Sequence, residues 1–157
     1  LSSDHVELCR YYSKLPHDTS LNERIYFARF LQAYEQRDYD EKLIDYITAL
    51  ESLIIQDDKE LGYKLALRGA YLLSRVPHER REKFYLLKEA YNRRGKIIHG
   101  KVARRTIQIS QIGRQFSQSE FSSAIEDCLR LLLRKNLFEP NIFADSGKLD
   151  EELFLKG

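Results

Sequence analysis

Apolar residues recur along the chain with the spacing of amphipathic helices. The clearest stripe runs from Leu43 to Ile54, where apolar side chains return on every helical turn. Similar stripes follow residues 20, 60, 77 and 117, and their apolar members include Phe27, Phe30, Leu31, Leu61, Leu65, Phe84, Leu87, Phe121, Ile125 and Leu129. Side chains three and four residues apart share one face of a helix, so each stripe predicts a helix with one buried face.

Four of these helices are preceded by a capping signal, in which an oxygen-bearing side chain is followed three residues later by Glu. The pairs are Ser20 with Glu23, Asp38 with Glu41, Asp57 with Glu60, and Ser117 with Glu120. The first side chain of each pair can accept a hydrogen bond from a backbone N–H that the first helical turn leaves without a partner. Another helix is predicted from Pro77, because proline suits the first helical turn.

The chain has only 3 Pro and 7 Gly in 157 residues, and this scarcity favours long helices over many strands. We therefore predict an all-α fold, an antiparallel bundle of four to five main helices, with residues 22–137 as its helical domain. Residues 1–21 would form a leading segment and residues 138–157 an acidic tail, either a docking helix or a disordered end. Between residues 102 and 115, Thr106, Ile107 and Ile109 fit either a short strand or a helical turn.

Composition excludes several protein classes. No apolar run approaches the roughly 20 residues that span a bilayer, and no signal peptide is visible, so we expect a cytoplasmic protein without a membrane partner. Cys9 and Cys128 form no metal-binding pattern and fit buried thiols in a reducing compartment. With only 4 widely spaced His, we expect no metal and no cofactor. The chain starts at Leu1 and has no Met, which favours a piece of a longer protein with a fused domain.

Positive charge is concentrated in one part of the chain. Residues 64–105 hold 13 Lys or Arg and 3 Asp or Glu, whereas the remainder holds 13 basic and 21 acidic residues. Such a segment is a candidate surface for a polyanion such as RNA. The alternative is an ordinary solvated helix face that pairs with the acidic segments.

Arg94 and His99 are the candidate catalytic residues. Arginine can hold a phosphodiester and stabilise developing negative charge, and histidine can exchange a proton near neutral pH. RNA supplies its own nucleophile, the 2′-hydroxyl, so this pair could cleave RNA without a metal. On a straight helix, however, residues five apart lie roughly 140° apart. A break in the helix at Gly95, or a second subunit, would be needed to bring the Arg94 and His99 side chains together. The alternative interpretation is that His99 and Gly100 form an ordinary helix terminus without a catalytic role.

Three segments together resemble the HEPN superfamily, and more closely its Apea-like branch. They are residues 49–53 (Ala-Leu-Glu-Ser-Leu), 60–70 (Glu-Leu-Gly-Tyr-Lys-Leu-Ala-Leu-Arg-Gly-Ala) and 91–100 (Tyr-Asn-Arg-Arg-Gly-Lys-Ile-Ile-His-Gly). The resemblance implies a helical homodimer whose shared cleft is, in many members, a metal-independent endoribonuclease site. It places the family's arginine on Arg94 and its histidine on His99. The family usually has a polar residue after the arginine, where this chain has Gly95, and some members are non-catalytic regulatory modules.

The remaining expectations concern residues around this pair. Cations expected to attract the RNA backbone are Arg93, Lys96, Lys101, Arg104 and Arg105. Glu51 is expected to pair with Arg68 or Arg94, to lie on the surface, or to orient the site. Arg68 is expected to be half-buried and paired, and Tyr91 to pack in the core or a dimer rather than stack on a base. The alternatives are a non-catalytic HEPN dimerisation module attached to an effector domain, and a basic DNA- or RNA-binding bundle without chemistry.

Overall fold

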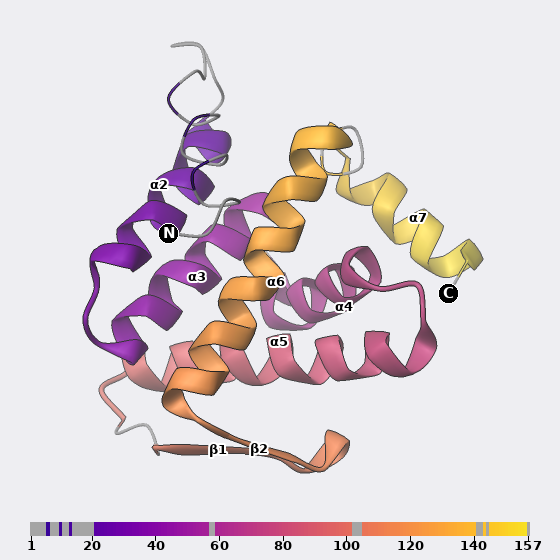
Figure 1. Ribbon diagram of the computed structural model, residues 1–157. Helices are drawn as coiled ribbons and strands as arrows, with labels where there is room; N and C mark the ends of the chain where they lie inside the picture. Colours follow the sequence, from indigo (N-terminus) through magenta and orange to yellow (C-terminus); the bar gives the residue numbers. More distant parts are fainter. Residues whose placement is uncertain are drawn as a thin grey trace.

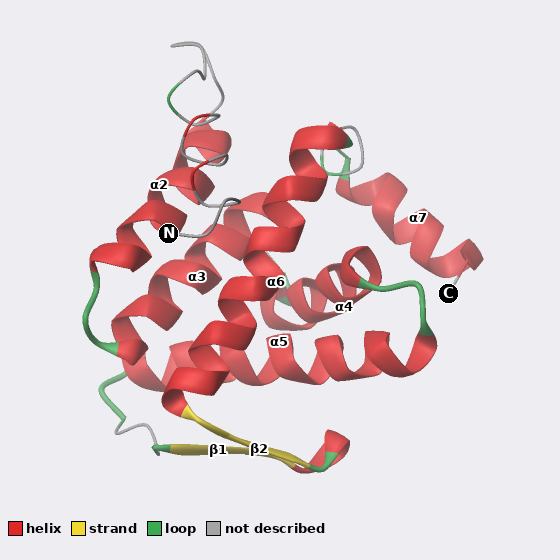
Figure 2. Ribbon diagram, in the orientation of Figure 1, coloured by secondary structure: helices red, strands yellow, loops and turns green. Residues whose placement is uncertain are grey.

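The computed structural model describes residues 6, 10, 13, 21–56, 59–101, 105–140, 143 and 145–156. Its helices are α2 (Leu21–Glu35), α3 (Tyr39–Ile54), α4 (Leu61–Leu73), α5 (Pro77–Ile98), α6 (Gln118–Phe138) and α7 (Ser146–Lys156). A hairpin of β1 (Thr106–Ile109) and β2 (Arg114–Ser117), joined by the 3₁₀ turn η1 (Ser110–Ile112), interrupts the helical order (Figures 1 and 2). The predicted helical bundle is confirmed, with a small two-stranded sheet added to it.

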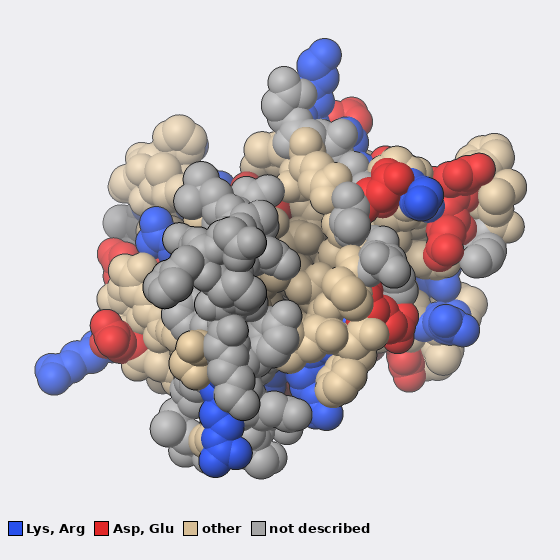
Figure 3. Space-filling model, turned by 90° about the horizontal axis from the view of Figure 1, so that it is seen from above, with Lys and Arg blue, Asp and Glu red and all other residues tan. Residues whose placement is uncertain are grey.

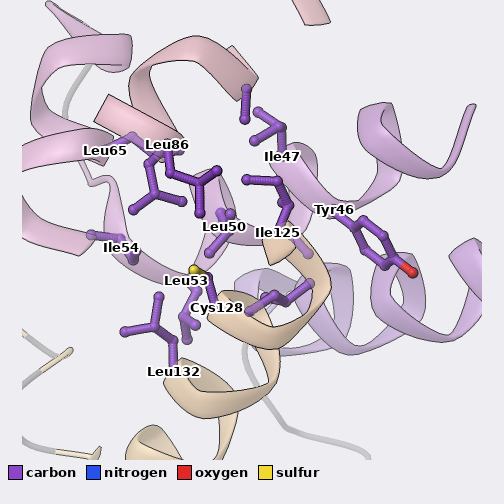
Figure 4. Close-up of a cluster of buried hydrophobic side chains, with 14 of the residues drawn as sticks. Tyr46, Ile47, Leu50, Leu53, Ile54, Leu65, Leu86, Ile125, Cys128 and Leu132 are labelled. Atoms are coloured by element: carbon purple, nitrogen blue, oxygen red, sulfur yellow. The ribbon is translucent and has the colours of Figure 1, made fainter. Parts of the chain in front are cut away.

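Helix α3 lies at the centre of the core. It packs against α2, α4, α5 and α6, while α4 and α5 pack against each other as a second pair (Figure 1). Figure 4 shows its apolar side chains meeting those of α4, α5 and α6, namely Ile47, Leu50, Leu53 and Ile54 with Leu65, Leu86, Ile125, Cys128 and Leu132. Because this face is apolar on every turn, burying it drives the association of the surrounding helices. None of the described helices is both long and apolar enough to cross a membrane.

The prediction that the cysteines are buried thiols is confirmed for one of the two. Cys128 is a free, buried thiol in α6, and burial raises the pKa of this thiol to about 11. It therefore packs as a small apolar side chain. Cys9 lies outside the described residues.

Three predicted helix starts are confirmed. The Asp38 carboxylate accepts hydrogen bonds from the backbone N–H groups of Asp40 (2.7 Å) and Glu41 (3.2 Å) and so caps α3. Ser117 and Glu120 form the predicted capping box at the start of α6. Pro77 occupies the first turn of α5. These signals are local, since each joins atoms within a few residues of one another, and sequence patterns record local interactions well.

The predicted start of α4 is wrong. Glu60 does not lie inside the first turn; it directly precedes Leu61 with a left-handed backbone (φ 54°), and its carbonyl accepts the N–H groups of Tyr63 and Lys64. The segment between α3 and α4 thus ends in a residue with a left-handed backbone, Glu60. A capping pattern in the sequence does not predict such a turn. Asp57 and Ser20, the other predicted caps, lie outside the described residues.

Two segments that the sequence left open have defined structures. Thr106, Ile107 and Ile109 belong to a strand, and Ile107 pairs with Phe116 so that both bury the same side of the hairpin. The tail contains a docked helix, because Leu149 of α7 is buried against the core. Most of the leading segment, residues 1–20, lies outside the described residues.

Candidate nucleic-acid interface

The candidate catalytic residues lie at the C-terminal end of α5. The helix continues through Gly95 to Ile98 without a break. His99 follows as its cap, and its N–H donates to the Gly95 carbonyl (3.1 Å). Gly100 then adopts a left-handed backbone (φ 68°), which glycine tolerates without steric cost. The backbone of His99 and Gly100 is therefore that of an ordinary helix terminus.

Arg94 is held by a carboxylate of the neighbouring helix. Its Nη2 lies 3.2 Å from Glu51 Oε2, and its Nη1 donates to Glu51 Oε1 at 3.4 Å. The side chains of Arg94 and Glu51 are 24% and 18% exposed, so the pair lies half-buried between α3 and α5. The Nε atom of Arg94 is buried and has no hydrogen-bond partner among the residues that the structure describes. Of the alternatives for Glu51, the structure thus shows the pairing with Arg94.

Burial raises the pKa of the Glu51 carboxyl, and the nearby charge of Arg94 opposes this shift without cancelling it. A half-buried carboxylate depends on its partner, because withdrawal from water disfavours the charged form. Arg94 is therefore both a candidate phosphate ligand and the cation that offsets part of the effect of burial on Glu51.

One protomer does not bring Arg94 and His99 together. The His99 side chain is exposed, and within the described part of the chain no hydrogen bond or ion pair joins it to Arg94. The angular separation expected for residues five apart on an unbroken helix accounts for this. Joint chemistry would consequently require a second protomer.

Tyr91 lies one turn before Arg94 and packs inside the bundle. A Cβ placed on Gly62 would come within 2.5 Å of the Tyr91 ring, so only glycine allows this close approach between α4 and α5. The Arg94 guanidinium lies 6.0 Å from the centre of the same ring. Tyr91 therefore helps to fix the surroundings of Arg94.

Arg68 belongs to a different part of the molecule. It is only 1% exposed, and its Nε and Nη2 each donate to an Asp150 oxygen at 2.7 Å. This two-bond contact joins α4 to α7. The expected pairing of Arg68 is present, but the side chain is fully rather than half buried. We assign it to the docking of α7.

The five predicted RNA-contacting cations separate into three groups. Lys96, Lys101 and Arg105 are exposed around the end of α5. Within the described part of the chain, Lys96 makes only a long contact with Glu89 (3.9 Å). Arg93 is 6% exposed and its Nη2 lies 3.0 Å from Asp40, so it is not part of the exposed cationic surface. Arg104 lies outside the described residues.

Sequence reasoning missed the hairpin beside this surface. Arg114, Gln108 and Gln115 are exposed on its strands. A usable signal was present, since residues 90–119 contain no Asp or Glu at all. Their basic residues are Arg93, Arg94, Lys96, Lys101, Arg104, Arg105 and Arg114.

A second polar cluster was also missed. The Glu126 carboxylate of α6 accepts hydrogen bonds from Tyr34 (2.6 Å), Tyr46 (2.9 Å) and Arg130. Burial raises the pKa of Glu126, but these three hydrogen bonds together outweigh it and leave the pKa below its ordinary value. These hydrogen bonds join α2 and α3 to α6, so we assign the cluster a structural role.

No group of His, Cys, Asp and Glu suited to holding a metal ion occurs among the residues that the structure describes. Comparisons of the chain with protein-family models, curated proteins and solved structures found no match. The family assignment therefore stays a prediction from the three segments that resemble it.

Proposed function

We propose that this chain is an RNA-binding domain of HEPN type, and that RNA lies against the end of α5 and the adjoining hairpin. The observation that carries the proposal is the acid-free stretch from residue 90 to residue 119. Of the cations in this stretch that the structure describes, four are exposed, namely Lys96, Lys101, Arg105 and Arg114. Clustered cations attract phosphates and release condensed counterions when they bind.

The distribution of acidic residues supports the same orientation. Asp150, Glu151 and Glu152 lie on α7, and acidic side chains gather on that side of the molecule in Figure 3. The α7 side would repel a polyanion, so RNA is steered towards the end of α5.

Cleavage is the catalytic extension of this proposal, and it requires a homodimer. His99 of one protomer would take the proton from the 2′-hydroxyl or give one to the leaving oxygen. Arg94 of the second protomer, oriented by Glu51, would stabilise the pentacovalent phosphate. The products of this chemistry are a 2′,3′-cyclic phosphate and a free 5′-hydroxyl.

A non-catalytic dimerisation or regulatory module of the same fold is the second candidate. The observation that favours it is the pairing of Arg94 with Glu51, which occupies both terminal nitrogens of the guanidinium. Gly95 occupies the position of the polar residue that is usual in the family, and this difference also favours a non-catalytic module.

The deciding experiment incubates a purified protein with RNA in EDTA and compares the wild type with Arg94→Ala and His99→Ala. Lys148→Ala, at an exposed position on α7, serves as the control. Cleavage by the wild type and the control, lost in both site variants, supports the nuclease. RNA that stays intact but bound supports RNA binding without cleavage. RNA that is neither bound nor cut contradicts the RNA-binding proposal and leaves the dimerisation or regulatory module.

If cleavage occurs, mixed dimers test whether the site is shared. A dimer of one Arg94→Ala subunit and one His99→Ala subunit keeps one Arg94 and one His99, each on a different protomer. If each site combines Arg94 of one protomer with His99 of the other, this mixed dimer has one complete site. Activity that reappears on mixing supports the shared site. Mixed dimers as inactive as their parents would place both groups in one protomer.

A further inference from the structure

The β1–β2 hairpin has one apolar and one polar face. Its register places Gln108 directly opposite Gln115, and Thr106 directly opposite Ser117. Ile107 and Phe116, on the alternate face, are buried. The outward face therefore presents two amides and two hydroxyls to solvent.

Most of this polar face is available to a ligand. Thr106, Gln108 and Gln115 are exposed, and their side chains make no hydrogen bond within the described residues. Ser117 is different, because its hydroxyl and its backbone N–H both contact Glu120 in the capping box. The free groups are thus two amides, side by side, and one hydroxyl.

The hairpin lies flat on the bundle. Its buried face contacts α5 and α6, and Arg81 of α5 donates to the Gln111 carbonyl (2.9 Å) and so fixes the tip (Figure 1). A hairpin held in this way cannot project into a deep groove. Its outward face suits a surface that is itself wide and shallow.

Cations adjoin the polar face at the end of the hairpin where β1 begins. Arg105 immediately precedes Thr106 of β1. Arg114 belongs to the other face, because it lies opposite buried Ile109 and its guanidinium is 4.7 Å from the centre of the inward Phe116 ring. Lys101 lies between the end of α5 and the hairpin. The nearest acid in the chain, Glu120, is already engaged with Ser117. A row of neutral hydrogen-bonding groups beside two exposed cations matches a shallow groove with a phosphate backbone along its edge.

We propose that the outward face of the hairpin binds the minor groove of double-helical RNA. This proposal rests on the proposed RNA-binding function and specifies its substrate. The minor groove of A-form RNA is wide and shallow and displays 2′-hydroxyls that both donate and accept. Gln108 and Gln115 carry both kinds of group and contact these hydroxyls. Arg105 and Lys101 contact the bordering phosphates.

Two other nucleic acids fit the same face less well. Unpaired bases are usually held by stacking on aromatic rings, and the outward positions of both strands carry none, since Phe116 points inward. The major groove of DNA is roughly 8.5 Å deep and is read by elements that project into it. DNA also lacks the 2′-hydroxyl.

The test measures the affinity of the full chain for three fluorescent probes of one sequence: duplex RNA, single-stranded RNA and duplex DNA. We expect the tightest binding to duplex RNA. Gln108→Ala combined with Gln115→Ala should weaken that complex about tenfold, because two hydrogen-bonding groups are lost. Gln111→Ala is the matched control, since the same side chain is removed from the tip of the same hairpin and only its backbone carbonyl contacts Arg81.

The outcomes separate the two proposals. Equal or tighter binding to duplex DNA or to single-stranded RNA overturns the minor-groove assignment and leaves RNA binding intact. A double variant that binds duplex RNA as well as the Gln111→Ala control also overturns it. Failure to bind any of the three probes contradicts the proposed function itself.

Discussion

The contact between Arg94 and Glu51 links stability to the candidate site at the level of single residues. Removing the cation leaves a half-buried carboxylate without its partner, which costs roughly 1–3 kcal/mol. The pKa of Glu51 is already raised by burial and rises further in Arg94→Gln. Because the folded state then holds its proton more tightly than the unfolded state, stability falls as pH rises from the unfolded pKa towards neutrality.

We therefore expect Arg94→Gln to lose most stability at pH 7 and little at pH 4, as measured by urea unfolding at each pH. Lys96→Gln is the control, since its contact with Glu89 is long and exposed, and it should change the free energy of unfolding by under about 0.5 kcal/mol. An equal loss at both pH values for Arg94→Gln would show that Glu51 does not depend on this charge.

Substitution by alanine at two glycines close to the site should change the stability of the fold in opposite directions. A Cβ on Gly62 would collide with the Tyr91 ring, so Gly62→Ala should destabilise the fold by about 1–3 kcal/mol. A Cβ on Gly95 would meet no atom within 4 Å, so Gly95→Ala should stabilise α5 by about 0.5–1 kcal/mol. Thermal unfolding of both variants checks this, and destabilisation by Gly95→Ala would contradict the open surroundings of that residue.

At the level of elements, α7 is held to the bundle by the contact between Asp150 and buried Arg68. Asp150→Ala leaves the Arg68 charge buried without its carboxylate and should cost roughly 2–4 kcal/mol. Glu151→Ala, at the exposed neighbouring position, should cost under about 0.5 kcal/mol. Urea unfolding compares them, and limited proteolysis reports whether α7 is released. Equal stability of the two variants would mean that the contact between Asp150 and Arg68 does not hold α7 to the bundle.

The Glu126 cluster joins α2 and α3 to α6 and gives the fold an acid-sensitive connection. Burial alone would raise the pKa of Glu126, but hydrogen bonds from Tyr34, Tyr46 and Arg130 bring it below the ordinary 4.5. A carboxyl with a depressed folded pKa stabilises the fold above the unfolded pKa, and this stabilisation is lost as pH falls through the folded pKa. Glu126→Gln should therefore be less stable than the wild type at pH 7, with the difference shrinking below pH 4.5. A difference that is constant with pH would contradict the cluster.

Sequence predicted the elements whose signals are local. Helices α3, α5 and α6 have long apolar stripes, and Asp38, Pro77 and Ser117 mark their starts. The hairpin and α7 stayed ambiguous because short elements depend on burial against distant residues, as Ile107 and Leu149 do. The left-handed turn at Glu60 carries no such local signal.

The candidate site was predictable in part. The concentration of cations near the end of α5 could be seen directly in the sequence. Which of two neighbouring arginines faces inward could not, because this depends on where α3 packs: Arg93 meets Asp40 and Arg94 meets Glu51. The outward face of the hairpin was likewise hidden, since it exists only once β1 and β2 pair.

At the level of the whole molecule, charge is divided between two sides. Acidic side chains gather on the side of α7 (Figure 3), and exposed cations occur at the end of α5 and on the hairpin, which lie on another side of the molecule in Figure 1. A molecule with this division should bind RNA in one orientation and with strong dependence on salt. The central claim of RNA binding at the end of α5 can therefore be tested through charge alone, without reference to catalysis.

The most direct measurement is RNA affinity as a function of salt concentration for the triple variant Lys96→Gln, Lys101→Gln and Arg105→Gln. Its matched control neutralises three exposed cations elsewhere, Lys59→Gln, Arg75→Gln and Lys148→Gln. We predict that the first variant binds RNA at least about tenfold more weakly and that its log–log salt slope falls by about 2, while the control keeps the wild-type slope. Equal losses in the two variants, or no loss in the first, would contradict RNA binding at the end of α5.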